Sequence, residues 1–133
     1  MEFIVSSILG RRISDEEYQQ KYGQEIPSGV VLREGKLIPW LGGVFGGMKG
    51  PAAAVTLGRT IVVNPEARLT PHLLTHELTH VRQWESDHLF PIRYAIATLR
   101  HGYSNNPYEV EARTLATSEW PTRDGGEGDH RHG

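Results

Sequence analysis

Cysteine is absent from this chain of 133 residues. Its absence excludes a disulfide framework, a thiol nucleophile, an iron–sulfur cluster and every zinc site built from thiolates. Any metal ion would therefore be held by imidazole, carboxylate or water. The seven histidines are the one compositional excess, so the search for a functional site begins with them.

An excess of one charge and long apolar runs are also missing. Fourteen basic and sixteen acidic side chains give a net charge of −2, and no basic stripe predicts a nucleic-acid partner. No stretch reaches the roughly 18 continuous apolar residues that a membrane helix needs, so no membrane span is expected. Residues 1–5 lack the basic head and long apolar body of a secretory signal. We therefore expect a cytoplasmic protein.

The length predicts one domain, because a chain of this size has room for a single hydrophobic core. We place that domain at residues 1–120. Residues 121–133 are rich in glycine and charged groups and predict a disordered tail. The order of turn and cap signals predicts an α+β fold, in which a small antiparallel or mixed sheet from two hairpins packs on an active-site helix and a backing helix.

Two hairpins are predicted in the first half of the chain. Residues 30–32 and 36–38 flank a short turn that contains Gly35, and residues 54–57 and 60–63 enclose Gly58-Arg59, which suits a type II′ turn. Residues 40–51 hold five glycines among apolar side chains. We judge this segment too glycine-rich for a helix and expect a closely packed turn region rather than a mobile flap.

Four helices have clear start signals. Ser14 and Glu17 fit a capping box that opens a short helix, which extends to about Tyr22. The other three begin with a proline in the first turn, two of them after a capping side chain. They are predicted over residues 71–85, 90–100 and 107–120.

The helix predicted over residues 71–85 carries His76, Glu77 and His80 in the pattern His-Glu-Leu-Thr-His. Residues four apart lie about 40° apart on one helix face, so both imidazoles can reach one ion at about 2.0–2.1 Å. Glu77 projects to the side, where it can act as a general base on water without being a ligand. The simpler alternative is a polar helix face whose histidines bond to the backbone.

A third ligand is needed, because catalytic zinc is typically held by three protein side chains. The last predicted helix offers Glu109 and Glu111, which lie on opposite sides of its apolar face and cannot both reach one metal. With Asn106 as the N-cap, Glu109 could instead complete a capping box. His88, near the end of the helix that carries His76 and His80, is expected to be a surface residue.

His76, Glu77 and His80, followed by Glu109 and Ala112, resemble the gluzincin metallopeptidases, and most closely their smallest bacterial members. The resemblance covers residues 56–115 and implies one catalytic zinc ion, held by His76, His80 and Glu109, with Glu77 as the catalytic base. The implied activity is hydrolysis of a peptide or protein substrate. Many gluzincins carry an aspartate that orients a zinc histidine, but Arg113 occupies that position. Glu111, Glu66 and Asp87 are the unranked replacements.

The resemblance also implies a hydroxyl or imidazole that stabilises the transition state and an edge strand that pairs with the substrate. Tyr103 and Tyr94 are the first candidates for that donor, and Tyr108 and His101 are further candidates. The strand nearest the motif predicts that the substrate pairs with Thr60, Ile61, Val62 and Val63. A non-catalytic module that keeps the shell of such a site and binds metal or peptide is the alternative function.

Overall fold

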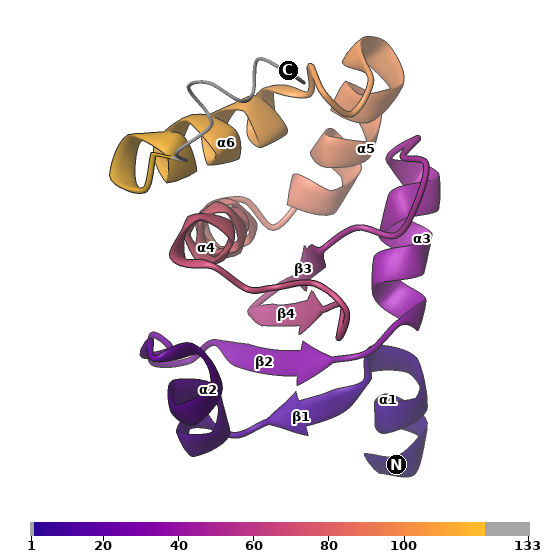
Figure 1. Cartoon of the computed structure of the whole chain (residues 1–133). Coiled ribbons are helices and arrows are strands. Elements are labelled where there is room, and N and C mark those ends of the chain that lie inside the picture. Colours follow the sequence, from indigo (N-terminus) through magenta and orange to yellow (C-terminus); the bar gives the residue numbers. More distant parts are fainter. Residues whose placement is uncertain (1, 122–133) are drawn as a thin grey trace.

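A four-stranded mixed sheet and six helices make up the part of the chain, residues 2–121, that the computed structural model describes (Figure 1). The predicted α+β class is confirmed. The tail predicted at 121–133 lies outside the described residues from 122 onward. The helices are α1 (Glu2–Leu9), α2 (Asp15–Tyr22), α3 (Leu37–Phe45), α4 (Pro71–Ser86), α5 (Phe90–His101) and α6 (Pro107–Glu119). The strands are β1 (Arg11–Ile13), β2 (Val31–Glu34), β3 (Ala54–Leu57) and β4 (Thr60–Val63).

The strand order is β1-β2-β4-β3. Strands β3 and β4 form the predicted antiparallel hairpin, in which Thr56 pairs with Ile61. Its turn has a positive φ of 67° at Gly58 and none at Arg59, as a type II′ turn requires. Strand β2 pairs in parallel with β4 on one side and antiparallel with β1 on the other.

The hairpin predicted over residues 30–38 is wrong. Residues 31–34 do form a strand, but residues 37–38 begin α3 instead of returning alongside β2. The backbone N–H of Gly35 donates to the carbonyl of Val63 on β4, so the chain continues along the sheet at the point where a hairpin would turn.

The glycine-rich segment is also corrected, because residues 37–45 are helical. Two of its glycines are needed for close packing. A Cβ on Gly42 would lie 2.6 Å from a methyl of Val55, and one on Gly43 would lie 2.1 Å from the carbonyl oxygen of Gly50. Glycine weakens a helix by about 1 kcal/mol relative to alanine, but here it lets α3 approach β3 and the following loop.

The prediction of a substrate-binding edge strand at Thr60, Ile61, Val62 and Val63 is wrong as well. Strand β4 lies between β2 and β3, so both of its backbone edges are already paired. Ile61, Val62 and Val63 are completely buried. The edge strand next to α4 is β3, which pairs only with β4 in the described sheet.

The helix predictions with cap signals are confirmed within a residue or two. Ser14 accepts from the backbone N–H of Glu17, and Thr70 accepts from the N–H of Leu73. Asn106 caps α6 by accepting from the N–H of Tyr108. None of the helices described is both long and apolar enough to cross a membrane.

Helix α4 lies between the sheet and α6, with α5 extending toward α3 (Figure 1). One face of α4 contributes Leu74 and Val81 to the core, which also contains Tyr18, Leu32 and Ile61 from the sheet side. The opposite face of α4 is covered by α6. His76 and His80 therefore lie where α4 meets α6, and little of either side chain is exposed.

Candidate metal centre

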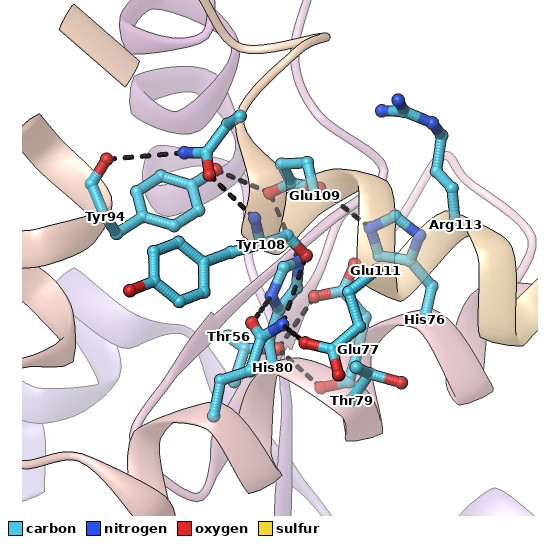
Figure 2. Close-up of polar contacts among 12 residues, drawn as sticks. Thr56, His76, Glu77, Thr79, His80, Tyr94, Tyr108, Glu109, Glu111 and Arg113 are labelled. Atoms are coloured by element: carbon cyan, nitrogen blue, oxygen red, sulfur yellow. Dashed lines mark hydrogen bonds and ion pairs between the residues drawn. The ribbon is translucent and has the colours of Figure 1, made fainter. Parts of the chain in front are cut away.

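His76 and His80 project from α4 toward the carboxylate of Glu109 on α6 (Figure 2). The Nε2 of His76 lies 3.0 Å from Oε1 of Glu109, and the Nε2 of His80 lies 3.2 Å from Oε2. Glu109 and His80 are buried, and His76 is nearly so. The structure therefore brings together the three side chains that the sequence predicts as ligands.

Glu109 occupies the third position and Glu111 does not. The carboxylate of Glu111 faces the amide of Gln83, one turn beyond His80. The capping-box alternative for Glu109 is also wrong, because the backbone N–H of Asn106 donates to the carbonyl of Tyr103. The carboxylate of Glu109 is thus directed toward the two histidines.

The three side chains have a donor set that suits a metal ion. Their ligand atoms, two imidazole nitrogens and one carboxylate oxygen, all lie within 4.8 Å of one another. Ligand atoms at about 2.0–2.1 Å from one ion in tetrahedral geometry would lie about 3.3 Å apart. In the structure each histidine Nε2 lies against a different oxygen of Glu109, at 3.0 and 3.2 Å, so the group could hold an ion once the three ligand atoms shift around it.

The charges of these groups depend strongly on one another. Burial disfavours the imidazolium of His80, but its hydrogen bond to Glu109 and the charges of Glu77 and Glu109 outweigh burial and raise the pKa of His80 to about 9. Burial also disfavours the carboxylate of Glu109, but the hydrogen bonds from His76 and His80 hold its pKa far below the usual range. The imidazole of His80 and the carboxylate of Glu109 thus each favour the charged form of the other.

Glu77 is buried beside the histidines, and the hydroxyl of Thr56 on β3 donates to its Oε1 at 2.7 Å. The same hydroxyl lies 3.2 Å from the backbone carbonyl of Glu77. Burial raises the pKa of Glu77, whereas the positive charges of His80 and His76 and the hydrogen bond from Thr56 lower it and partly offset burial. A raised carboxylate pKa is typical of groups that take up protons during a reaction.

The Nδ1 of His80 lies 2.8 Å from Oε1 of Gln83, which is buried on the same helix. The amide nitrogen of Gln83 in turn donates to Oε1 of Glu111 at 2.7 Å and to the carbonyl of Tyr108 at 3.1 Å. The sequence reasoning missed Gln83. Its position three residues after His80, one helical turn along on the same face, is the signal that could have identified it.

The other residues considered as partners of the zinc histidines are engaged elsewhere. Glu66 pairs with Lys36, and Asp87 pairs with Arg93. Arg113 donates to the backbone carbonyl of Ser104. Of the three predicted carboxylates, Glu111 is thus the one linked to a histidine, and the link passes through Gln83.

A cavity of about 570 Å³ opens beside the three ligands and Glu77. Its walls are mostly apolar and come from α3, β3, α4, α5 and the loop before α6. The lining includes Phe45, Val55, Leu57, Trp84, Phe90 and Leu99. Because the edge strand β3 forms part of this wall, an extended chain could lie along it within reach of Glu77.

Tyr94 and Tyr103, the first candidates for a hydroxyl donor, both line the cavity. The hydroxyl of Tyr94 donates to Oε2 of Glu109. Burial and the nearby Glu109 carboxylate raise the pKa of both phenols, so both keep their protons at neutral pH. Tyr108 is not part of the lining and packs against Phe90, and His101 is exposed outside it.

A family model described as the eCIS core domain matches residues 48–88. The matched segment is less than a third of the chain and includes β3, β4 and α4. It therefore contains Thr56, His76, Glu77 and His80 but ends before Glu109. No curated protein and no solved structure gives a significant match.

Proposed function

We propose that this chain is a zinc-dependent peptidase of the gluzincin type. The observation that carries the proposal is the convergence of His76, His80 and Glu109 around one point, with the buried carboxylate of Glu77 beside it. Two histidines and one glutamate are a common ligand set of catalytic zinc. A polar helix face without function would not need a carboxylate from a second helix between its two histidines.

Zinc bound to these ligands would supply a polarised substrate carbonyl and a water of lowered pKa. Glu77 then accepts a proton from water and later delivers it to the leaving amine. Thr56 keeps the carboxylate of Glu77 directed at the cavity. Tyr94 and Tyr103 are the candidates for hydrogen-bond donors to the developing oxyanion, because both remain protonated in the cavity wall. Tyr94 would have to exchange its bond to Glu109 for one to the substrate, because a phenol has a single hydrogen to donate.

The substrate that suits this cavity is an extended peptide. Strand β3 offers a backbone edge, and strand addition recognises the main chain of a peptide rather than its side chains. The apolar walls favour apolar side chains on either side of the bond to be cleaved. The strand proposed to pair with the substrate is thus β3, in place of the residues of β4 that the sequence predicted.

The proposal is tested by comparing the wild-type chain with Glu77→Gln, each loaded with one equivalent of zinc, on casein and a peptide library. The substitution keeps the shape of the side chain but removes the base. We expect both proteins to bind zinc equally and the variant to lose roughly 10²–10⁴-fold in hydrolysis. A chelator should abolish wild-type activity, and added zinc should restore it.

Zinc binding without hydrolysis by the wild type on every substrate tried would contradict the peptidase proposal. That result would favour the alternative of a module that binds metal or peptide without catalysis. Equal hydrolysis by wild type and Glu77→Gln would show that the activity comes from another site or a contaminant.

A further inference from the structure

We propose that Gln83 is a positioning residue that fixes the ring of His80 with its proton on Nδ1, so that Nε2 presents a lone pair to the metal. Glu111 and the backbone carbonyl of Tyr108 hold Gln83 in place. The inference rests on the metal site of the proposed function and concerns the orientation and tautomer of one of its ligands.

The orientation of the Gln83 amide follows from its neighbours. Its nitrogen carries two hydrogens, and two acceptors lie within reach, Oε1 of Glu111 at 2.7 Å and the carbonyl of Tyr108 at 3.1 Å. Neither acceptor has a hydrogen to donate. The opposite orientation of the amide would place its oxygen against both, so the nitrogen faces them and the oxygen faces His80.

The state of His80 follows from that orientation. An amide oxygen can only accept a hydrogen bond, so the Nδ1 of His80, 2.8 Å away, carries a proton. When the imidazole is neutral, its lone pair is then on Nε2, the atom that faces Glu109. Gln83 and His80 are both buried, with 8% and 6% of their surface exposed, so water cannot easily replace the amide.

The arrangement also explains how a site with Arg113 in place of an orienting aspartate can work. Zinc histidines nearly always donate their second N–H to a carboxylate, carbonyl or water. For His80 that acceptor is the amide oxygen of Gln83, and the carboxylate of Glu111 stands one step behind it. The carboxylate of Glu111 thus acts on His80 by polarising the amide of Gln83.

The test compares zinc affinity among variants that break and restore this chain of hydrogen bonds. Gln83→Leu removes it. Gln83→Glu keeps an acceptor for His80 but places two carboxylates against each other. The double variant Gln83→Glu with Glu111→Gln restores a donor between positions 83 and 111. Gln20→Leu, an exposed glutamine on α2, is the matched control.

We expect Gln83→Leu to weaken zinc binding by roughly 10–100-fold, as measured by competition with a chelator. The double variant should return to within about threefold of wild type, and Gln20→Leu should not differ from it. In the zinc-loaded wild type, ¹⁵N NMR should show a slowly exchanging proton on Nδ1 of His80. In Gln83→Leu this Nδ1 proton should exchange rapidly with water.

Unchanged zinc affinity and an unchanged Nδ1 proton in Gln83→Leu would overturn the inference. So would failure of the double variant to recover affinity relative to Gln83→Glu. These readouts do not depend on turnover. A wild type that binds zinc and responds as expected but cleaves no peptide would support the role of Gln83 and contradict only the peptidase proposal. A wild type that binds no zinc would overturn both.

Discussion

Thr56 and Glu77 are the residue pair on which the proposed chemistry depends most directly. A hydrogen bond to a carboxylate stabilises its charged form and lowers its pKa. Thr56→Val removes that bond and keeps the shape of the side chain, so the pKa of Glu77 rises further above its usual value. The base is then protonated up to a higher pH.

We therefore expect the acidic limb of the pH–rate profile of Thr56→Val to move to higher pH, with kcat lowered by about tenfold at neutral pH. Zinc affinity should not change, because the hydroxyl of Thr56 bonds to Glu77 and not to a ligand. Thr60→Val, the same substitution on β4, is the control. An acidic limb at the wild-type position would show that Thr56 does not tune Glu77.

His80 supplies a second prediction at the scale of one residue. Its pKa of about 9 means that the metal-free imidazole is protonated at pH 7, whereas a metal ligand must be neutral. Zinc binding at pH 7 should therefore release about one proton from His80, and the release should vanish as the pH rises above about 9. Calorimetry in buffers of different ionisation enthalpy measures it. Proton release that did not fall between pH 7 and 10 would contradict this assignment.

The ligand residues were predictable from sequence because their geometry is local. His76 and His80 share a face of any regular helix, so the motif alone places two of the ligands. Glu109 needed the resemblance as well, because its distance from α4 depends on how two helices pack. Gln83 was missed since its role appears only once Tyr108 and Glu111 of α6 lie opposite it.

At the scale of elements, Asn106 joins α5 to α6 and is completely buried. Its oxygen caps α6, and its amide nitrogen donates to Oγ1 of Thr98 at 2.9 Å and to the carbonyl of Tyr94 at 3.3 Å. Asn106→Ala removes the cap and leaves buried acceptors without their donor. We expect the free energy of unfolding to fall by about 2–4 kcal/mol.

Urea denaturation measures this loss, and Asn105→Ala, an exposed neighbour, is the control. The free energy of unfolding of Asn106→Asp should lie between those of Asn106→Ala and Asn105→Ala, because aspartate keeps the capping oxygen and loses the amide donor. If Asn106→Ala were as stable as Asn105→Ala, the bonds between α5 and α6 would contribute nothing measurable.

Elements opened by caps and prolines were predicted well, and α3 was not. A proline in the first turn and a capping hydroxyl act within a few residues, so they can be read from the chain directly. The glycines of α3 serve contacts with residues outside the helix, Val55 on β3 and Gly50 in the following loop. Their local effect opposes a helix, and tertiary packing overrides it.

At the scale of the whole molecule, the sheet order could not be deduced from hairpin signals. The parallel pairing of β2 with β4 is made between strands separated by α3 and β3, and no turn motif marks it. The consequence for the site is large, because this pairing makes β4 internal and leaves β3 at the edge beside the cavity. The order of turn and cap signals along the chain predicted the fold class, whereas the position of the substrate edge needed the topology.

The metal site joins α4, in the middle of the molecule, to α6 on its outer side, so zinc should stabilise the whole fold. A ligand that binds only the folded state adds about 2.7 kcal/mol at a free concentration of 100 times its Kd, which for a domain of this size raises Tm by roughly 10 °C. Glu109→Ala should lose most of this increase, because the remaining ligands both belong to α4 and zinc no longer bridges the two helices. Glu119→Ala, an exposed substitution on the same helix, should keep it. Calorimetric scans with and without zinc distinguish these outcomes, and an equal rise in Tm for both variants would mean that zinc binds without Glu109.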